Sequence, residues 1–289
     1  MQFFINGLVT GLNIALLSLA FSVVYLSSRI FHVALGGVYV LTPFMAWTAL
    51  QHHLGWMISI PFALASGVIL SLGCEWLNHC WLERKQAGSS AHTISSLGIY
   101  LVVVQSVALI WGNDPKVLRD GLDRMVQFGA ATMTLSQIIS AIVSALVMAL
   151  FYAWLYQSDR GLQFRAMAGN PKELALRGYN IHQLRLLAFG LSGLLCAISS
   201  LLFAYDIGFD PNAGLITALL AIVAFVIGGQ NSFWGAALGG IFLGILRSTT
   251  VWFLSATWQD AITFLVLVAF LVMRPQGILG KRARLEVEA

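Results

Sequence analysis

The sequence predicts an all-α polytopic membrane protein with about eight or nine transmembrane helices. Hydrophobic residues make up 58% of the 289 residues and charged residues only 10%, whereas soluble domains carry roughly 25% charged residues. Three long runs contain no charged residue: Ile30 to Cys74, Met125 to Ser158 and Pro211 to Leu246. The run from Ile139 to Trp154 is apolar on every helical face, which is typical of membrane helices and not of outer-membrane barrel strands. A water-soluble enzyme fold is therefore excluded.

The polar breaks divide the chain into nine apolar segments, which we expect to be helices. These segments cover residues 4–27, 33–51, 55–81, 93–112, 134–157, 185–207, 214–229, 235–254 and 258–274. The seventh is short and ends at Gly228 and Gly229, so we expect a re-entrant or broken segment near 209–232, with a short tilted span as the alternative. No stretch is long enough for a soluble domain, and residues 1–289 are expected to form a single transmembrane domain.

The distribution of Lys and Arg predicts how these segments are oriented. With the amino terminus outside and the carboxyl terminus cytoplasmic, the inner loops collect twelve of the sixteen Lys and Arg residues, as the positive-inside rule requires. The net charge of +4 therefore needs no nucleic-acid partner. Because the first charge in the chain is Arg29, the positive region of a cleavable signal peptide is missing, and we expect the first segment to stay in the membrane. The twelve inner cations are Arg29, Arg84, Lys85, Arg160, Arg165, Lys172, Arg177, Arg185, Arg274, Lys281, Arg282 and Arg284.

The polar loop 159–184 carries the signals of a short capped helix. Asn170 can cap its first turn, Pro171 suits the first helical position and Gly178 can end it. A helix of roughly 10 Å is too short to be stable alone, so it needs a surface on which to dock. The loop is suited to passing force from a soluble motor, and an amphipathic loop on anionic headgroups is the alternative. The residues assigned to coupling are Arg165, Asn170, Pro171, Lys172, Glu173 and Gly178.

Glycines in the eighth segment favour a close helix contact. Gly235/Gly239 and Gly240/Gly244 are pairs at four-residue spacing, and a stripe of small residues lets another helix approach closely. The same pattern recurs at Gly7 and Gly11 in the first segment. We expect packing inside the subunit, with a subunit interface as the alternative. The candidate packing or pathway residues are Gly36, Gly37, Gly228, Gly229, Gly235, Gly239, Gly240, Gly244 and Arg247.

Charged side chains inside apolar segments are costly and are usually paired or functional. Arg247 lies several residues from the nearest segment end, and both structural pairing and a pathway role stay open for it. Glu75 lies near the inner end of its segment and is expected to reach the headgroups. His32 is interpreted as a lone contact with the headgroups.

Motifs for catalysis and for ATP binding are incomplete. Gly190-Leu191-Ser192-Gly193 matches the motif of intramembrane serine proteases of the rhomboid type, but no histidine follows Ser192 to act as a base. The sequence contains neither His-Glu-x-x-His nor a Gly-x4-Gly-Lys-Ser/Thr phosphate loop. Cys74, Cys80 and Cys196 form no Cys-x-x-Cys pair and are expected to be buried thiols. We therefore expect no catalytic residue, no metal site and no enzyme activity, and any ATP hydrolysis must belong to a partner.

Four sequence blocks in a fixed order carry a resemblance to a known family. They are RAMAGNPKELALRGYNIHQLRLLAFGLSGLLCAISSLLFA (165–204), IGFDPNAG (207–214), VIGGQNSFWGAALGGIFLGIL (226–246) and MRPQGILGKR (273–282). Together with the opening span GLNIALLSLAFSVVYLSSRI, they resemble the permease subunits of bacterial branched-chain amino acid ABC importers of the high-affinity type, and the related urea and short-amide permeases. The chain departs from the family at HVALGG (32–37), where Gly36 matches but the family's His and Glu are absent.

The resemblance implies a permease domain in the bacterial inner membrane, with 159–184 as its cytoplasmic coupling loop. Such a subunit takes a branched-chain amino acid or a related small amphipathic solute from a periplasmic binding protein and moves it by alternating access. It pairs with a second permease subunit and with two cytoplasmic ATPase subunits, which bind ATP, so that this chain holds no cofactor itself. Membrane lipid is its remaining partner. A secondary transporter or channel for a small solute is the alternative.

Overall fold

The computed structural model describes residues 2–119, 121, 123–128, 131–274 and 276–280, and most of them are helical. Each of the nine expected apolar segments is a helix, which confirms the all-α polytopic fold. The largest differences from the expected ends are four residues, at Ser89 where 93 was expected and at Ile181 where 185 was expected. Hydropathy therefore locates these helices closely, because each one must keep its backbone polar groups bonded within itself in lipid.

Within the described residues, seven helices are long and apolar enough to cross a membrane. They are α1 (Gln2–Ser28), the continuous run Trp56–Arg84, α5 (Ser89–Trp111), α6 (Leu135–Gln157), α9 (Ile181–Asp206), α11 (Phe233–Phe253) and the run Ala256–Met273. The run Trp56–Arg84 consists of α3 (Trp56–Gly73), a π-helical turn η1 (Cys74–His79) and α4 (Cys80–Arg84). The last run consists of a 3-10 turn η2 (Ala256–Trp258) and α12 (Gln259–Met273).

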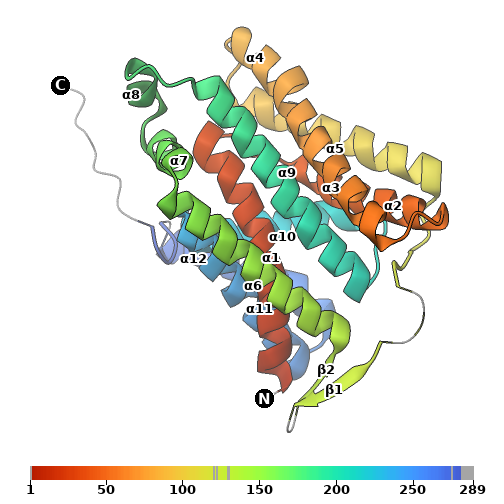
Figure 1. Cartoon of the computed structure of the whole chain (residues 1–289). Coiled ribbons are helices and arrows are strands. Elements are labelled where there is room, and N and C mark those ends of the chain that lie inside the picture. Colours follow the sequence, from red (N-terminus) through yellow and green to blue (C-terminus); the bar gives the residue numbers. More distant parts are fainter. Residues whose placement is uncertain (1, 120, 122, 129–130, 275, 281–289) are drawn as a thin grey trace.

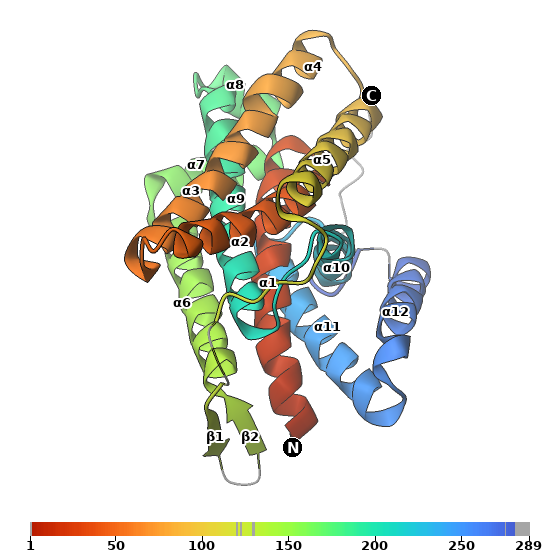
Figure 2. The ribbon, with the colours of Figure 1, turned by 90° about the vertical axis from the view of Figure 1, so that its right-hand side faces the viewer.

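Two apolar helices are shorter than a full crossing. These are α2 (Leu35–Gln51), with 17 residues, and α10 (Ala213–Gly228), with 16. The shortness of α10 agrees with the expected short segment near 209–232, whereas α2 was expected to be an ordinary span. Figure 2 views α10 nearly end-on while α1 runs up the picture, so their axes cross at a large angle.

The amino terminus lies at one end of the molecule and the longest polar loop at the other (Figures 1 and 2). Beside the amino terminus is a two-stranded antiparallel hairpin of β1 (Met125–Phe128) and β2 (Ala131–Thr134), which the sequence analysis did not predict. At the opposite end lie α4, α7 (Asp159–Gly169) and α8 (Pro171–Leu176). Three of the twelve predicted inner cations, Lys281, Arg282 and Arg284, lie outside the described residues.

Helix α1 forms the centre of the structure. It packs against α9, α10, α11 and α6, and side chains such as Leu16, Leu19 and Phe21 are almost completely buried. In contrast, Thr263 is the only fully buried residue of α12. Val266, Leu267 and Phe270 are partly buried against the core, whereas other apolar side chains, such as Leu265 and Val272, are exposed. The cysteines are free thiols; Cys74 and Cys196 are buried, as expected, and Cys80 is half-buried. The most buried helix is therefore the first one in the chain.

Candidate functional site

Capping interactions fix the shape of the α7–α8 segment, which we define as residues 159–178. The side chain of Ser158 accepts a hydrogen bond from the Gly161 amide at the start of α7. At the start of α8, the Asn170 Oδ1 accepts one from the Glu173 amide at 3.3 Å, and Pro171 occupies the first position. Gly178 follows with φ +85°, a left-handed conformation that favours glycine. The expected short helix at Asn170 is thus present, whereas α7 is an additional helix that the sequence analysis missed.

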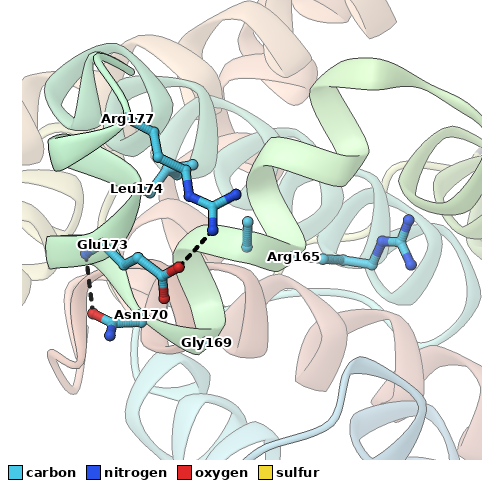
Figure 3. Close-up of a pocket in the computed structure, with 7 residues that line it drawn as sticks. Arg165, Gly169, Asn170, Glu173, Leu174 and Arg177 are labelled. Atoms are coloured by element: carbon cyan, nitrogen blue, oxygen red, sulfur yellow. Dashed lines mark hydrogen bonds and ion pairs between the residues drawn. The ribbon is translucent and has the colours of Figure 1, made fainter.

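Helix α8 is held to the rest of the protein at one point. Leu174 is its only buried residue, whereas Leu176 is 89% exposed. Figure 3 shows the polar pocket between α7 and α8, where Glu173 bonds Arg177 at 2.6 Å and Arg165 points away from α8. A pocket of about 330 Å³ is lined by Arg165, Ala166, Gly169, Asn170, Glu173, Leu174 and Arg177. The expected coupling residues therefore lie close together on an exposed surface. Arg165, Asn170 and Glu173 line this pocket, whereas Pro171, Lys172 and Gly178 do not.

A buried ion pair involves α9, a few residues beyond the end of the α7–α8 segment. Arg185, in the second turn of α9, donates from Nη2 to Glu75 Oε2 at 3.2 Å and lies 3.0 Å from Oε1. Its Nη1 also pairs with Glu83. Glu75 is completely buried, so the expectation that it reaches the headgroups is wrong. The error arises because the partner that neutralises Glu75 is on another helix, more than 100 residues along the chain.

A row of histidines lies beside this ion pair and corrects the interpretation of His32. His32 is 1% exposed, and its Nδ1 lies 3.3 Å from Nε2 of His79. The other ring nitrogen of His79 lies 3.1 Å from Nδ1 of His92. Because His79 uses opposite nitrogens, the three rings form a hydrogen-bonded row and do not converge on one point. Burial lowers the pKa of His32, which lies between α1 and α2, to about 3, so this imidazole is neutral.

The glycines of α11 face two different helices of the same subunit. A Cβ on Gly240 would overlap the Cα of Ala15, and one on Gly244 would overlap Gly11, both in α1. On a neighbouring face of α11, Gly239 lies against the carbonyl of Ala224 in α10. We define the α1–α11 glycine contact by its members: Gly7, Gly11, Ala15, Gly240, Gly244 and Ser248. These contacts within one subunit are of the kind that the sequence analysis expected for these glycines.

The remaining candidate glycines bring backbones together in three places. Gly36 approaches α10, because a Cβ there would lie 2.8 Å from the carbonyl oxygen of Gly214. Gly37 faces Val103 of α5. Gly228 lies against Gly235, and Gly229, with φ +121°, lies against residues 276–280. These contacts join the starts of α2 and α10 and hold the turn between α10 and α11.

A small cavity lies beside the contact between α2 and α10. Its volume is about 180 Å³, and most of its walls are apolar. Asp210 and Thr217 are among its few polar residues. Its lining is Tyr39, Val40, Pro43, Ser200, Phe203, Ala204, Ile207, Gly208, Phe209, Asp210, Ala213 and Thr217. Its lining combines apolar walls with a few polar groups, which is the character of small-molecule sites.

Arg247 is paired within the subunit. Its Nη1 donates to Asp260 Oδ1 at 2.7 Å and lies 3.4 Å from the Thr263 hydroxyl, both in α12. The Arg247 side chain is 14% exposed. Of the two roles that the sequence left open, these contacts match structural pairing.

A polar contact in the middle of the bundle was missed by the sequence analysis. Asn13 of α1 donates to the Ser140 hydroxyl at 2.7 Å and accepts from that of Ser144 at 2.8 Å, both on α6. Its signal in the sequence is the four-residue spacing of Ser136, Ser140 and Ser144, which places all three on one helical face. Among the residues that the structure describes, no three His, Cys, Asp or Glu side chains are grouped so as to hold a metal ion.

Comparison with known proteins gives matches along nearly the whole chain. Residues 3–271 match the family described as branched-chain amino acid transport system / permease component. The high-affinity branched-chain amino acid transport system permease protein BraD of Pseudomonas aeruginosa is 26% identical, with 97% of this chain and 96% of that protein covered. LivH of Escherichia coli K12, a permease protein of the same description, is 24% identical at the same coverage. The autoinducer 2 import system permease protein LsrC of Enterobacter sp. 638 is 29% identical over 89% of this chain and 74% of its own length. No solved structure matches significantly.

The family match covers the seven helices described above that can cross a membrane, except Gln2 at the start of α1 and the last two residues of Ala256–Met273. It confirms the resemblance that the four sequence blocks indicated. The named relatives are transport permeases and not enzymes. The apolar helices are those of a multi-pass membrane protein. The chain therefore belongs to the family of branched-chain amino acid transport system permease components.

Proposed function

We propose that the chain is the permease subunit of an ABC importer that moves a branched-chain amino acid, or a related small amphipathic solute, by alternating access. Separate ATPase subunits bind ATP and dock on the α7–α8 segment. A second permease subunit completes the pathway, and a periplasmic binding protein delivers the solute. The names of BraD and LivH support this substrate class.

The observation that carries the proposal is the exposed α8 with its single anchor, Leu174. A two-turn helix is not stable alone, so a capped one held by one side chain is suited to a partner surface. Beyond Gly178, the side chain of Asn180 caps α9 by accepting from the Gln183 amide at 3.2 Å. A displacement of α8 is therefore passed to the start of α9 through only a few residues.

From α9 the displacement reaches α3 through Arg185. Its pairing with Glu75 joins α9 to the π-helical turn η1, and π-helical turns are frequent at functional sites. Since Glu75 is buried, it cannot exchange this partner for water without a large cost. Arg185 is therefore the residue that links the docking helix to the helices of the pathway.

In the proposed orientation, α8 lies in the cytoplasm and the amino terminus lies outside. Arg29 follows the end of α1, Arg84 ends α4 and Arg165 lies within α7. These parts of the chain lie at the same end of the molecule as α8 (Figure 1), which supports an inner face by the positive-inside rule. The cavity of about 180 Å³ beside Gly36 and Gly214 takes the solute during passage. Its apolar walls suit a branched side chain, and Asp210 suits an ammonium group.

The proposal is tested by uptake into proteoliposomes that contain the complete complex. Uptake should require ATP and should stop when both ATPases carry a substitution that blocks hydrolysis. Uptake that persists with inactive ATPases, or that follows an ion gradient in liposomes holding this chain alone, would identify a secondary transporter or channel instead.

Docking is tested by Lys172→Glu and Gly178→Pro. Proline has φ near −65° and cannot adopt the φ of +85° at residue 178, so it should displace α8 from α9. Both variants should insert normally but hydrolyse ATP without uptake. Lys85→Glu is the matched control, because it makes the same charge change at the same end, outside the α7–α8 segment. Normal uptake by both variants would contradict the docking role.

A further inference from the structure

A second polar pocket, of about 420 Å³, lies beside the α7–α8 segment. Three separate parts of the chain form it: the end of α1, the α6–α7 region and the turn between α10 and α11. We call it the arginine pocket, because two arginines line it. Its lining residues are Arg29, Tyr156, Arg165, Ala168, Gly169, Asn231, Ser232 and Phe233.

The two arginines of this pocket lack a negative partner among the described residues. Arg29 donates to the Ala168 carbonyl at 2.8 Å and to Asn231 Oδ1 at 3.3 Å, which are both neutral acceptors. The Arg165 guanidinium lies over the Tyr156 ring at 4.7 Å. Neither arginine takes part in the ion pairs that the described residues form. Two like charges around one pocket repel each other, and an anion between them relieves that repulsion.

Arg165, which lines the pocket, also has one buried donor without an acceptor. Arg165 Nε is shielded from solvent and has no hydrogen-bond partner among the described residues. A buried donor without an acceptor costs free energy comparable to a lost hydrogen bond. Because a guanidinium presents its donors as a planar fork, the group that best satisfies two of them is a phosphate, which has several acceptor oxygens.

Aromatic side chains place the pocket at the level of the lipid headgroups. Trp234 stacks on Tyr152 with ring centroids 4.0 Å apart and is 47% exposed. Tyr156, which lines the pocket, is 44% exposed and also faces Trp234. Exposed Trp and Tyr side chains of this kind mark the boundary between headgroups and acyl chains.

The two helices that carry these rings, α6 and α11, also expose leucine side chains farther from α7. Leu150 and Leu146 of α6 are 61% and 56% exposed, and Leu238, one turn beyond Trp234 on α11, is 43% exposed. A lipid whose phosphate lies in the pocket can place its acyl chains along the exposed apolar surface of α6 and α11. A free phosphate ion would make no use of this surface.

We propose that the arginine pocket binds the phosphate of an anionic phospholipid, held by Arg29 and Arg165. Basic pockets between membrane helices commonly bind such headgroups. The bound lipid bridges the end of α1, the start of α11 and α7, and so fixes the base from which α8 projects. The inference does not require an ATPase, and its failure would leave the uptake experiments unaffected.

The test is native mass spectrometry of the full-length chain, titrated with phosphatidylglycerol or phosphatidylcholine. The wild type should bind phosphatidylglycerol at least about tenfold more tightly, the difference expected from one or two charge-assisted hydrogen bonds. Arg29→Gln with Arg165→Gln should abolish this preference. Arg29→Lys with Arg165→Lys should retain only part of it, because the charges remain but the planar forks are lost. Arg160→Gln is the matched control: Arg160 is an exposed arginine of α7 outside the pocket and should leave binding unchanged.

Inorganic phosphate distinguishes the two sources of the anion. In the wild type, millimolar phosphate should displace little phosphatidylglycerol, because the free ion lacks the acyl-chain contacts. If phosphate alone stabilises the wild type but not the double Gln variant, and the two lipids bind equally, the site holds a free ion and the lipid proposal is overturned. Equal binding of the two lipids by the wild type, with no effect of phosphate, would overturn the anion site altogether. Unchanged phosphatidylglycerol preference in the double Gln variant would overturn the role of the arginines.

Discussion

The α1–α11 glycine contact and the α7–α8 segment differ in how tightly their residues are packed against the rest of the subunit. At the glycine contact, backbones meet without side chains between them, and a Cβ at Gly7 would lie 2.9 Å from the Cα of Ile245. The α7–α8 segment is also locally well defined by its caps, but Leu174 is the only residue of α8 that is buried. The residues of the glycine contact are covered by other parts of the same subunit, whereas most of the surface of α8 is exposed.

The difference indicates where movement can occur. Helices packed backbone to backbone have one arrangement, because any shift brings atoms into overlap. A helix with one buried anchor can be displaced at little cost, so a partner can both stabilise and move it. We therefore expect substitutions in the glycine contact to prevent folding and substitutions in α8 to affect coupling.

The largest effect is expected from Gly240→Leu. Its side chain would have to occupy the space of the Ala15 backbone, so the loss of stability should exceed about 5 kcal/mol and the chain should not accumulate as a folded species. Size-exclusion chromatography in detergent measures this. Gly98→Leu is the control, because nothing lies within 4 Å of a Cβ at that exposed helical position. A folded, monodisperse Gly240→Leu protein would show that α1 and α11 do not make this contact.

Arg185→Ala should have the next largest effect. It leaves the carboxylate of Glu75 buried without its charged partner, which typically costs about 3–5 kcal/mol. Thermal unfolding in detergent measures the loss. The matched control is Glu83→Gln, which removes the other partner of Arg185, an acid that is 59% exposed and can be replaced by water. Equal effects of the two substitutions would mean that the buried pair is not the one that matters.

Asn170→Ala should cost about 1 kcal/mol, the usual value for removing a helix cap. The loss should be confined to α8, because the lost hydrogen bond is the one to the Glu173 amide. Amide hydrogen exchange of residues 171–177 reports it. Asn212→Ala is the control, since Asn212 precedes α10 without making a side-chain cap. Similar local changes at the two helices would exclude capping as the cause.

Glu173→Gln should have the smallest effect, at most about 0.5 kcal/mol. Its pair with Arg177 is an i,i+4 pair whose side chains are 56% and 69% exposed, and exposed pairs contribute little. A double-mutant cycle with Arg177→Gln measures the coupling. A coupling energy above about 1.5 kcal/mol would indicate that the pair is less solvated than its exposure suggests.

Local signals in the sequence were sufficient for the helices and for the start of α8. Apolar runs located every long helix because lipid leaves no alternative backbone structure. The Asn170-Pro171 pair and Gly178 located α8 because its caps lie within a few residues of it. Helix α7 was missed because only Gly161, Phe164 and Met167 of its eleven residues are buried, which is too few for a clear periodic pattern.

The polar contacts could not be predicted because their partners come from distant parts of the chain. His32 meets His79 only after α2 and α3 are placed, and Glu75 meets Arg185 only after α9 packs on α3. Read alone, His32 and Glu75 looked like contacts with the headgroups. Gly240 and Gly244 were easier to interpret, because small residues at four-residue spacing have one main use in a membrane helix.

The most direct test of the docking role of α8 is hydrogen exchange of residues 170–178, compared between the chain alone and the complex with its ATPases. Alone, α8 should exchange quickly, because Leu174 is its only buried residue. In the complex its amides should be protected at least about tenfold, while α1 is unchanged, since a partner surface adds stability only where it binds. Equal exchange of α8 in the two samples would contradict the account.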